Sequence, residues 1–109
     1  MILSKLDTVL SERKADDPER SYVASLYAGG INKILEKVGE EATEVIIAGK
    51  DHAIDSANPK ALVKEVADLW FHTMVLLHQV DLDSGAVLDE LGMRFGISGH
   101  EEKANRSAD

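Results

Sequence analysis

Residues 59–80, with the sequence PKALVKEVADLWFHTMVLLHQV, limit the fold of this chain more than any other segment. Asn58 and Pro59 provide a cap and a first-turn proline, which are typical of a helix start, and we expect the helix to run to about Val80. Apolar side chains occur on nearly all sides of it, and such a helix is normally buried on both sides. A chain of 109 residues has few other elements to cover it. We therefore expect a second copy of the chain to provide the remaining cover.

The rest of the chain is also predicted to be helical, and it has no convincing strand. Helical spacing of apolar residues, or a capping residue before an apolar run, occurs in four further segments: about 2–14, 21–28, 31–49 and 84–95. A loop is expected over 49–58 and a polar tail from about 97. The predicted fold is one all-α domain, residues 1–109, whose helical hairpins form a four-helix-bundle-like core that is completed by homo-oligomerisation.

Composition and charge argue against several classes of partner. The chain has 20 acidic and 12 basic residues and a net charge of −8, so nucleic acid is not an expected partner. Its longest apolar stretch, LWFHTMVLLHQV, is too short to cross a bilayer, so no membrane contact is expected. The chain has no cysteine, and the opening MILSKLDTVLSERK lacks the apolar core of a signal peptide. We expect a soluble protein of the cytoplasm.

Acidic residues are grouped on the two longest predicted helices. The segment KVGEEATEV carries Glu40, Glu41 and Glu44, and the segment EVAD carries Glu65 and Asp68. Residues three apart on a helix are neighbours on its surface. Since each acidic strip borders an apolar face, packing of the two faces would bring four carboxylates together. Converging carboxylates must either take up protons or bind cations.

The chemistry of these side chains limits which ion they would hold. Oxygen ligands alone favour Mg²⁺, Mn²⁺ or Ca²⁺, whereas di-iron bundles use Glu-x-x-His pairs. Mg²⁺ usually shares its coordination with substrate phosphates, so the pattern suggests a metal-assisted reaction at a phosphate. The alternative is that each acidic pair is only part of a solvated helix face, and spacing alone does not decide between the two.

The pattern Glu40-Glu41-x-x-Glu44, followed by Glu65-x-x-Asp68, resembles the signature of the all-α NTP pyrophosphohydrolases, the MazG-like superfamily. More closely, the chain resembles the phosphoribosyl-ATP pyrophosphohydrolases of histidine biosynthesis. The similar stretches are SYVASLYAGGINKILEKVGEEATEVIIAGKD, LVKEVADLWFH and RFGISGHEEKANR, which together span most of residues 21–106 in order. The combination of KILEKVGEEATEV with a terminal RFGISGHEEK is far more specific than the acidic motif alone.

The resemblance implies Mg²⁺-dependent hydrolysis of the α–β phosphoanhydride of phosphoribosyl-ATP, with Mn²⁺ as a substitute. The products would be phosphoribosyl-AMP and pyrophosphate. The resemblance assigns the metal to Glu41, Glu44, Glu65 and Asp68. Glu40 lies away from the apolar face of its helix, so it matches the ligand positions least well. It would support the ligands, or position or deprotonate the attacking water. These five residues form the predicted catalytic set of a stand-alone enzyme.

A further group of residues is predicted to bind the substrate: Lys33, Lys37, His72, Arg94, Ser98 and Lys103. For the two lysines, pairing with glutamates one turn away on the helix is an equal alternative. For His72, which lies one turn after Asp68, the alternative is a hydrogen-bonded position at the edge of the core.

The positive charge near the C-terminus comes from Arg94, Lys103 and Arg106. Together with Ser98 and Gly99, these side chains would close over the substrate phosphates, and the alternative is a solvated tail. Two more features are expected to be structural. Trp70 is expected in the oligomer core, with a base-stacking platform as the alternative. Gly29-Gly30 is expected as a turn between helices, and the alternative is that its backbone N–H groups meet phosphate.

Two other functions stay open from the sequence. A related enzyme would act on another triphosphate such as dUTP or dCTP, although RFGISGHEEK argues against this by resemblance. A non-catalytic helical interaction module with an acidic surface would release no pyrophosphate, with or without Mg²⁺. In such a module, Glu41→Gln and Asp68→Asn would be neutral or slightly stabilising.

Overall fold

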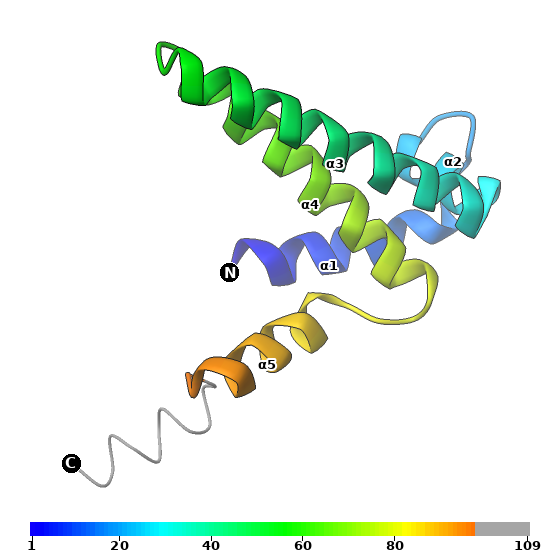
Figure 1. Ribbon diagram of the computed structural model, residues 1–109. Coiled ribbons are helices and arrows are strands. Elements are labelled where there is room, and N and C mark those ends of the chain that lie inside the picture. Colours follow the sequence, from blue (N-terminus) through cyan, green and yellow to red (C-terminus); the bar gives the residue numbers. More distant parts are fainter. Residues whose placement is uncertain (98–109) are drawn as a thin grey trace, which may run out of the picture.

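The computed structural model describes residues 1–97, and these residues are almost entirely helical (Figure 1). The helices are α1 (Ile2–Glu12), α2 (Tyr22–Gly29), α3 (Ile31–Ile54), α4 (Pro59–Gln79) and α5 (Ser84–Phe95), with a 3₁₀ turn η1 (Arg13–Ala15) after α1. No strand occurs in residues 1–97, so the predicted all-α class is confirmed. None of the helices in this range is long and apolar enough to cross a bilayer. The described residues end at residue 97, so the predicted tail lies outside them from residue 98 onward.

Helices α3 and α4 pack side by side as a hairpin, which is the longest feature of the molecule (Figure 1). Gly30 alone separates α2 from α3, and its φ of 87° is a conformation that glycine adopts readily. Pro59 lies in the first turn of α4, as predicted. The position of the loop was wrong, because α3 continues to Ile54 and leaves only residues 55–58 as the turn. A glycine inside a helix costs about 1 kcal/mol relative to alanine, and packing against α4 outweighs this at Gly49.

The buried core lies where α1 and α2 meet the hairpin. It is one cluster that draws side chains from α1, α2, α3 and α4, namely Leu10, Leu26, Ile34, Met74 and Val75. Phe71 packs against it, so the side of α4 that carries Phe71 and Val75 is covered within the chain.

Another face of α4 is not covered in the same way. Val63 and Trp70 are 66% and 60% exposed, and Ile46 and Ile47 of α3 are also exposed. Trp70 lines an apolar groove bounded by α1, α4 and α5, together with side chains such as Leu3 and Leu88. Large apolar patches are uncommon on monomeric proteins. Cover by a second copy of the chain stays a prediction that this surface supports.

A partly buried hydrogen-bond network joins α1 to the connection between α4 and α5. Asp7 Oδ1 accepts hydrogen bonds from His78 Nε2 (2.9 Å) and from the backbone N–H of Ser84 (3.1 Å), and Asp7 Oδ2 accepts one from the Ser84 hydroxyl. Lys14 Nζ donates to the carbonyl oxygen of His78 at 2.6 Å. The first turn of α5 is thereby attached to α1 through one carboxylate.

Candidate functional site

Three carboxylates from two helices converge on the α3–α4 hairpin. Glu41 and Glu44 project from α3 and Glu65 from α4, and one carboxylate oxygen of each lies within 4.8 Å of the others. The spacing of three residues places Glu41 and Glu44 on one side of α3, and the packing of the hairpin brings Glu65 to them. The structure therefore brings together three of the four predicted metal ligands.

The pKa values of two of these carboxylates are raised. For Glu41 the largest cause is burial, followed by the negative charge of Glu44, and Asp68 adds to the shift. For Glu65 the largest cause is a hydrogen bond with Glu44, followed by burial and by the charges of Glu44, Asp68 and Glu41. Asp68 is thus close enough to act on the cluster, although it is not one of the three residues within 4.8 Å. Like charges that share a site disfavour one another's ionised form.

Two carboxylate oxygens in this cluster are buried without a hydrogen-bond partner among residues 1–97, Glu41 Oε2 and Glu65 Oε2. Such atoms are uncommon, because a buried polar atom without a partner loses its hydration and gains nothing in return. Several carboxylate oxygens at close range are the ligands that Mg²⁺ and Mn²⁺ prefer. The donor set therefore fits the ion that the sequence predicts.

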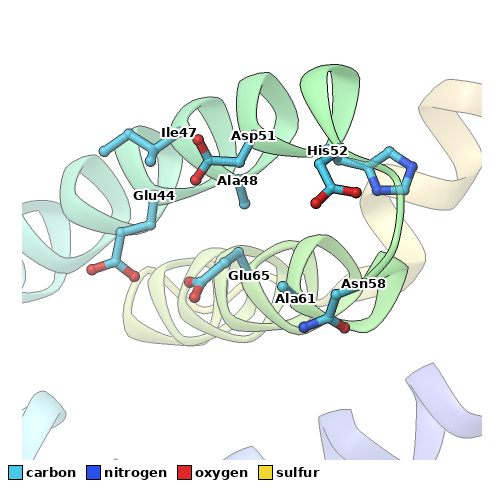
Figure 2. Close-up of a pocket in the computed structure, with 9 residues that line it drawn as sticks. Glu44, Ile47, Ala48, Asp51, His52, Asn58, Ala61 and Glu65 are labelled. Carbon is cyan, nitrogen blue, oxygen red and sulfur yellow. The ribbon is translucent and has the colours of Figure 1, made fainter.

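A cavity of about 330 Å³ extends from the cluster toward the turn of the hairpin. Figure 2 shows Glu44 and Glu65 at one end of it and His52 and Asn58 at the other. Asp51 also lines the cavity, so its acidic groups outnumber its basic ones. A phosphate chain would be repelled here unless cations neutralise the carboxylates.

Comparison with known proteins identifies the family of this chain. The family model described as phosphoribosyl-ATP pyrophosphohydrolase matches residues 3–95. The chain belongs to the phosphoribosyl-ATP pyrophosphohydrolase family. A relative, the phosphoribosyl-ATP pyrophosphatase of Hydrogenovibrio crunogenus (strain DSM 25203 / XCL-2), is 59% identical over 106 residues, which cover 97% of this chain and 93% of that protein. The resemblance inferred from the sequence is confirmed, and the matched range contains both acidic motifs of this pyrophosphohydrolase.

The two lysines and Glu40 of the pyrophosphohydrolase lie on α3, toward the α2 side of the cluster. Lys37 Nζ donates to Glu40 Oε2 at 3.2 Å, and this hydrogen bond is the largest cause of the raised pKa of Lys37. Glu40 is exposed, as predicted from its position away from the apolar face of the helix. The side-chain stem of Lys33 passes over Gly29. Phosphate contacts for both lysines stay predictions, and for Lys37 the pairing alternative is observed with Glu40.

His72 of the pyrophosphohydrolase is 6% exposed and has a partner at each ring nitrogen. Nδ1 lies 2.8 Å from the carbonyl oxygen of Asp68, and Nε2 lies 2.8 Å from the hydroxyl of Tyr22. This is the hydrogen-bonded position that the sequence left as the alternative, and a substrate contact stays a prediction. Tyr22 received no role from the sequence, because a tyrosine in the first turn of a short helix carries no functional pattern.

The remaining predicted substrate residues are not brought to the cluster within the described part of the chain. Arg94 lies on α5, where its Nε donates to Glu90 Oε1 at 3.2 Å, and α5 packs against α1. Ser98 and Lys103 lie outside the described residues, as do Gly99 and Arg106.

Proposed function

We propose that this phosphoribosyl-ATP pyrophosphohydrolase hydrolyses the α–β phosphoanhydride of its substrate with Mg²⁺ held by Glu41, Glu44, Glu65 and Asp68. The products are phosphoribosyl-AMP and pyrophosphate, in the second step of histidine biosynthesis in the cytoplasm. The observation that carries the proposal is the meeting of three carboxylates from two helices in a member of this family. The unpartnered buried oxygens of Glu41 and Glu65 support it.

The carboxylates and the ion have separate tasks in this proposal. When bound, Mg²⁺ supplies neutralising charge to the departing pyrophosphate and lowers the pKa of a coordinated water. The carboxylates of α3 and α4 hold the ion at a fixed place on the hairpin, and Mn²⁺ satisfies the same oxygen donors. Alignment of the reacting groups then provides most of the remaining acceleration.

Glu40 and Lys37 act at the exposed edge of the cluster. We assign to Glu40 the orientation of the attacking water or acceptance of its proton, and to Lys37 a contact with a phosphate oxygen. Both assignments require the ion pair between them to open. Exposed ion pairs contribute little to stability, so substrate binding can replace this one.

The other predicted substrate contacts, among them Arg94, Ser98 and Lys103, would reach the phosphates by closure of the C-terminal part or from a second subunit. The exposed apolar surface around Trp70 supports a homodimer or a higher homo-oligomer. In that assembly, each α3–α4 hairpin gains the cover that its own chain does not supply, and the result is the four-helix-bundle-like core that the sequence predicts. The small-molecule substrate is the expected partner, and neither nucleic acid nor a membrane is.

The direct test is pyrophosphate release by the pure protein with phosphoribosyl-ATP, compared with ATP, dUTP and dCTP, in the presence of Mg²⁺ or EDTA. We expect turnover of phosphoribosyl-ATP far above that of the other triphosphates, and loss of turnover in EDTA. Equal turnover of all triphosphates would favour a general NTP pyrophosphohydrolase. Absence of pyrophosphate release in every condition would favour a non-catalytic module.

A further inference from the structure

The cavity on the hairpin extends beyond the carboxylate cluster, toward the turn between α3 and α4 (Figure 2). Beyond the cluster, the polar side chains that line it are Asp51, His52, Asp55 and Asn58. Glu44 and Asp51 are seven residues apart on α3, which is about 10 Å along the helix axis. A ligand with one end at the cluster therefore has room for a second group in this part of the cavity, which the proposed metal site does not use.

This part of the cavity is acidic and has no basic side chain to balance it. Neither a lysine nor an arginine lines the cavity within residues 1–97. The carboxylates of Asp51 and Asp55 form no ion pair with another residue of this range. Asp55 Oδ1 accepts a hydrogen bond from the backbone N–H of Ala57 at 3.0 Å, which leaves its charge in place. A hollow lined by one sign of charge attracts a ligand of the opposite sign.

A second metal ion suits this part of the cavity less well than an organic cation. Within residues 1–97, the only group of three ligand atoms that lie within 4.8 Å of one another comes from the cluster of Glu41, Glu44 and Glu65. Asp51, with its neighbours along the turn, forms no such group, and protein-held metal ions need several ligand atoms at close range.

The walls of the cavity favour a ring-shaped ligand. Ile47, Ala48 and Ala61 provide apolar surface beside the polar groups, a combination that is typical of sites for small molecules. The volume of about 330 Å³ is sufficient for one planar ring system. Nδ1 of His52 is buried without a hydrogen-bond partner among residues 1–97, and a ligand that bonds to it would offset the loss of hydration.

Phosphoribosyl-ATP, the substrate of this family, contains a group with these properties. Its additional ribose is attached to N1 of the adenine. Substitution at N1 converts the N1–C6–N6 unit into an amidine, which binds a proton and is positively charged near neutral pH. The adenine of ATP is neutral under the same conditions. The two nucleotides therefore differ in the charge of the base as well as in its substituent.

We propose that the cavity between the carboxylate cluster and the hairpin turn binds the positively charged, N1-substituted adenine of phosphoribosyl-ATP, and that Asp51 and Asp55 supply the opposite charge that distinguishes it from ATP. The inference rests on the proposed function, because it places the triphosphate at the cluster. Both aspartates are exposed, so the substituent on N1 can leave the cavity toward solvent beside them. They determine specificity and take no part in bond cleavage.

The test uses two isomeric nucleotides, 1-methyl-AMP and N6-methyl-AMP, of which only the first has a positively charged base at neutral pH. Isothermal titration calorimetry in Mg²⁺ at pH 7 should show that the wild type binds 1-methyl-AMP about tenfold more tightly, as expected for two partly solvated charge pairs. In Asp51→Asn/Asp55→Asn this preference should nearly disappear, while the affinity for N6-methyl-AMP changes less than about twofold.

Both substitutions preserve the shape of the side chain, and an asparagine at position 55 can still accept the hydrogen bond from Ala57. Asp51→Asn alone, at a side chain without a hydrogen bond to the described residues, should lower the preference about threefold and provides the comparison if the double variant does not fold. For hydrolysis of phosphoribosyl-ATP, the double variant should raise KM about tenfold and leave kcat within about twofold.

The matched control is Glu36→Gln, which removes one negative charge from an exposed position of α3 outside the cavity. This variant should bind both isomers like the wild type. A wild type without preference for 1-methyl-AMP, or a folded double variant that keeps the full preference, would overturn the proposal. A wild type that prefers 1-methyl-AMP but does not hydrolyse phosphoribosyl-ATP would instead count against the proposed function.

Discussion

Glu65 is the carboxylate that α4 adds to Glu41 and Glu44 of α3. Its raised pKa has a direct consequence for the stability of the fold. The hydrogen bond with Glu44, then burial and the neighbouring charges, disfavour its ionised form in the folded state. A group whose folded pKa is raised stabilises the fold at pH values below its unfolded pKa and loses that contribution as pH rises through the folded pKa. At neutral pH without metal, the cluster is therefore a source of instability, and we expect a bound cation to relieve it.

Glu65→Gln should consequently have opposite effects with and without metal. In EDTA at pH 7, we expect a melting temperature a few degrees above that of the wild type, because the amide removes one charge from the cluster. In excess Mg²⁺, the wild type should gain stability while Glu65→Gln gains little. Thermal unfolding followed by circular dichroism measures both. Glu36→Gln, an exposed change on α3, is the control, and an equal response of the wild type and Glu65→Gln to Mg²⁺ would contradict the assignment.

The pKa of Asp7 is shifted in the opposite direction, to a lower value. Burial by itself would raise its pKa, but hydrogen bonds from Ser84 and His78 outweigh burial and lower the pKa below the ordinary 3.8. A group with a lowered folded pKa stabilises the fold above its unfolded pKa and loses that contribution as pH falls through the folded value.

We therefore expect Asp7→Asn to be less stable than the wild type by about 1 kcal/mol or more at pH 7, because several buried donors lose a charged acceptor. This difference should shrink as pH falls toward 3. Urea unfolding at pH 7 and at pH 3 measures it. A difference that is the same at both values would show that the Asp7 carboxylate is not the source.

At the scale of elements, two glycines of α3 have different roles: Gly30 caps its N-terminus, and Gly49 lies in its interior. Gly49 lies within the helix, and a Cβ added there meets no atom within 4 Å. Gly30 has a φ of 87°, which side-chain-bearing residues adopt with strain.

Gly49→Ala should stabilise the protein by about 0.5–1 kcal/mol, because alanine loses less backbone entropy in a helix. Gly30→Ala should destabilise it by about 1 kcal/mol or more, because alanine is strained at this φ. Chemical denaturation of the two variants against the wild type checks both signs. Destabilisation by Gly49→Ala would indicate that α3 ends before this residue in solution.

At the scale of the whole molecule, the exposed apolar groove beside Trp70 determines the expected assembly. Trp70→Asp should weaken self-association more than tenfold, as truncation or charging of a central aromatic anchor usually does. Sedimentation equilibrium measures this. Ile54→Asp, at an 84% exposed position next to the hairpin turn, is the control and should associate like the wild type. A wild-type chain that is monomeric at all concentrations would contradict the predicted oligomer.

The sequence determined by itself the features that depend on neighbours along the chain. Helical periodicity and the Pro59 start placed the helices within one or two residues, except at the end of α3. The acidic motifs and RFGISGHEEK are contiguous stretches, so the family was also evident. The end of α3 was not, because a local breaker such as Gly49 is overridden by packing against α4.

Only the tertiary structure decided which groups meet. The alignment of α4 against α3 brings Glu65 to Glu41 and Glu44, whereas Asp68 acts on them from slightly farther away. Tyr22 and His72 are 50 residues apart in the chain, and their contact exists because α2 folds back against α4. No local pattern encodes such a contact, since it depends on the packing of three helices at once. The charges of the site could therefore be read from the sequence, while the contact between Tyr22 and His72 could not.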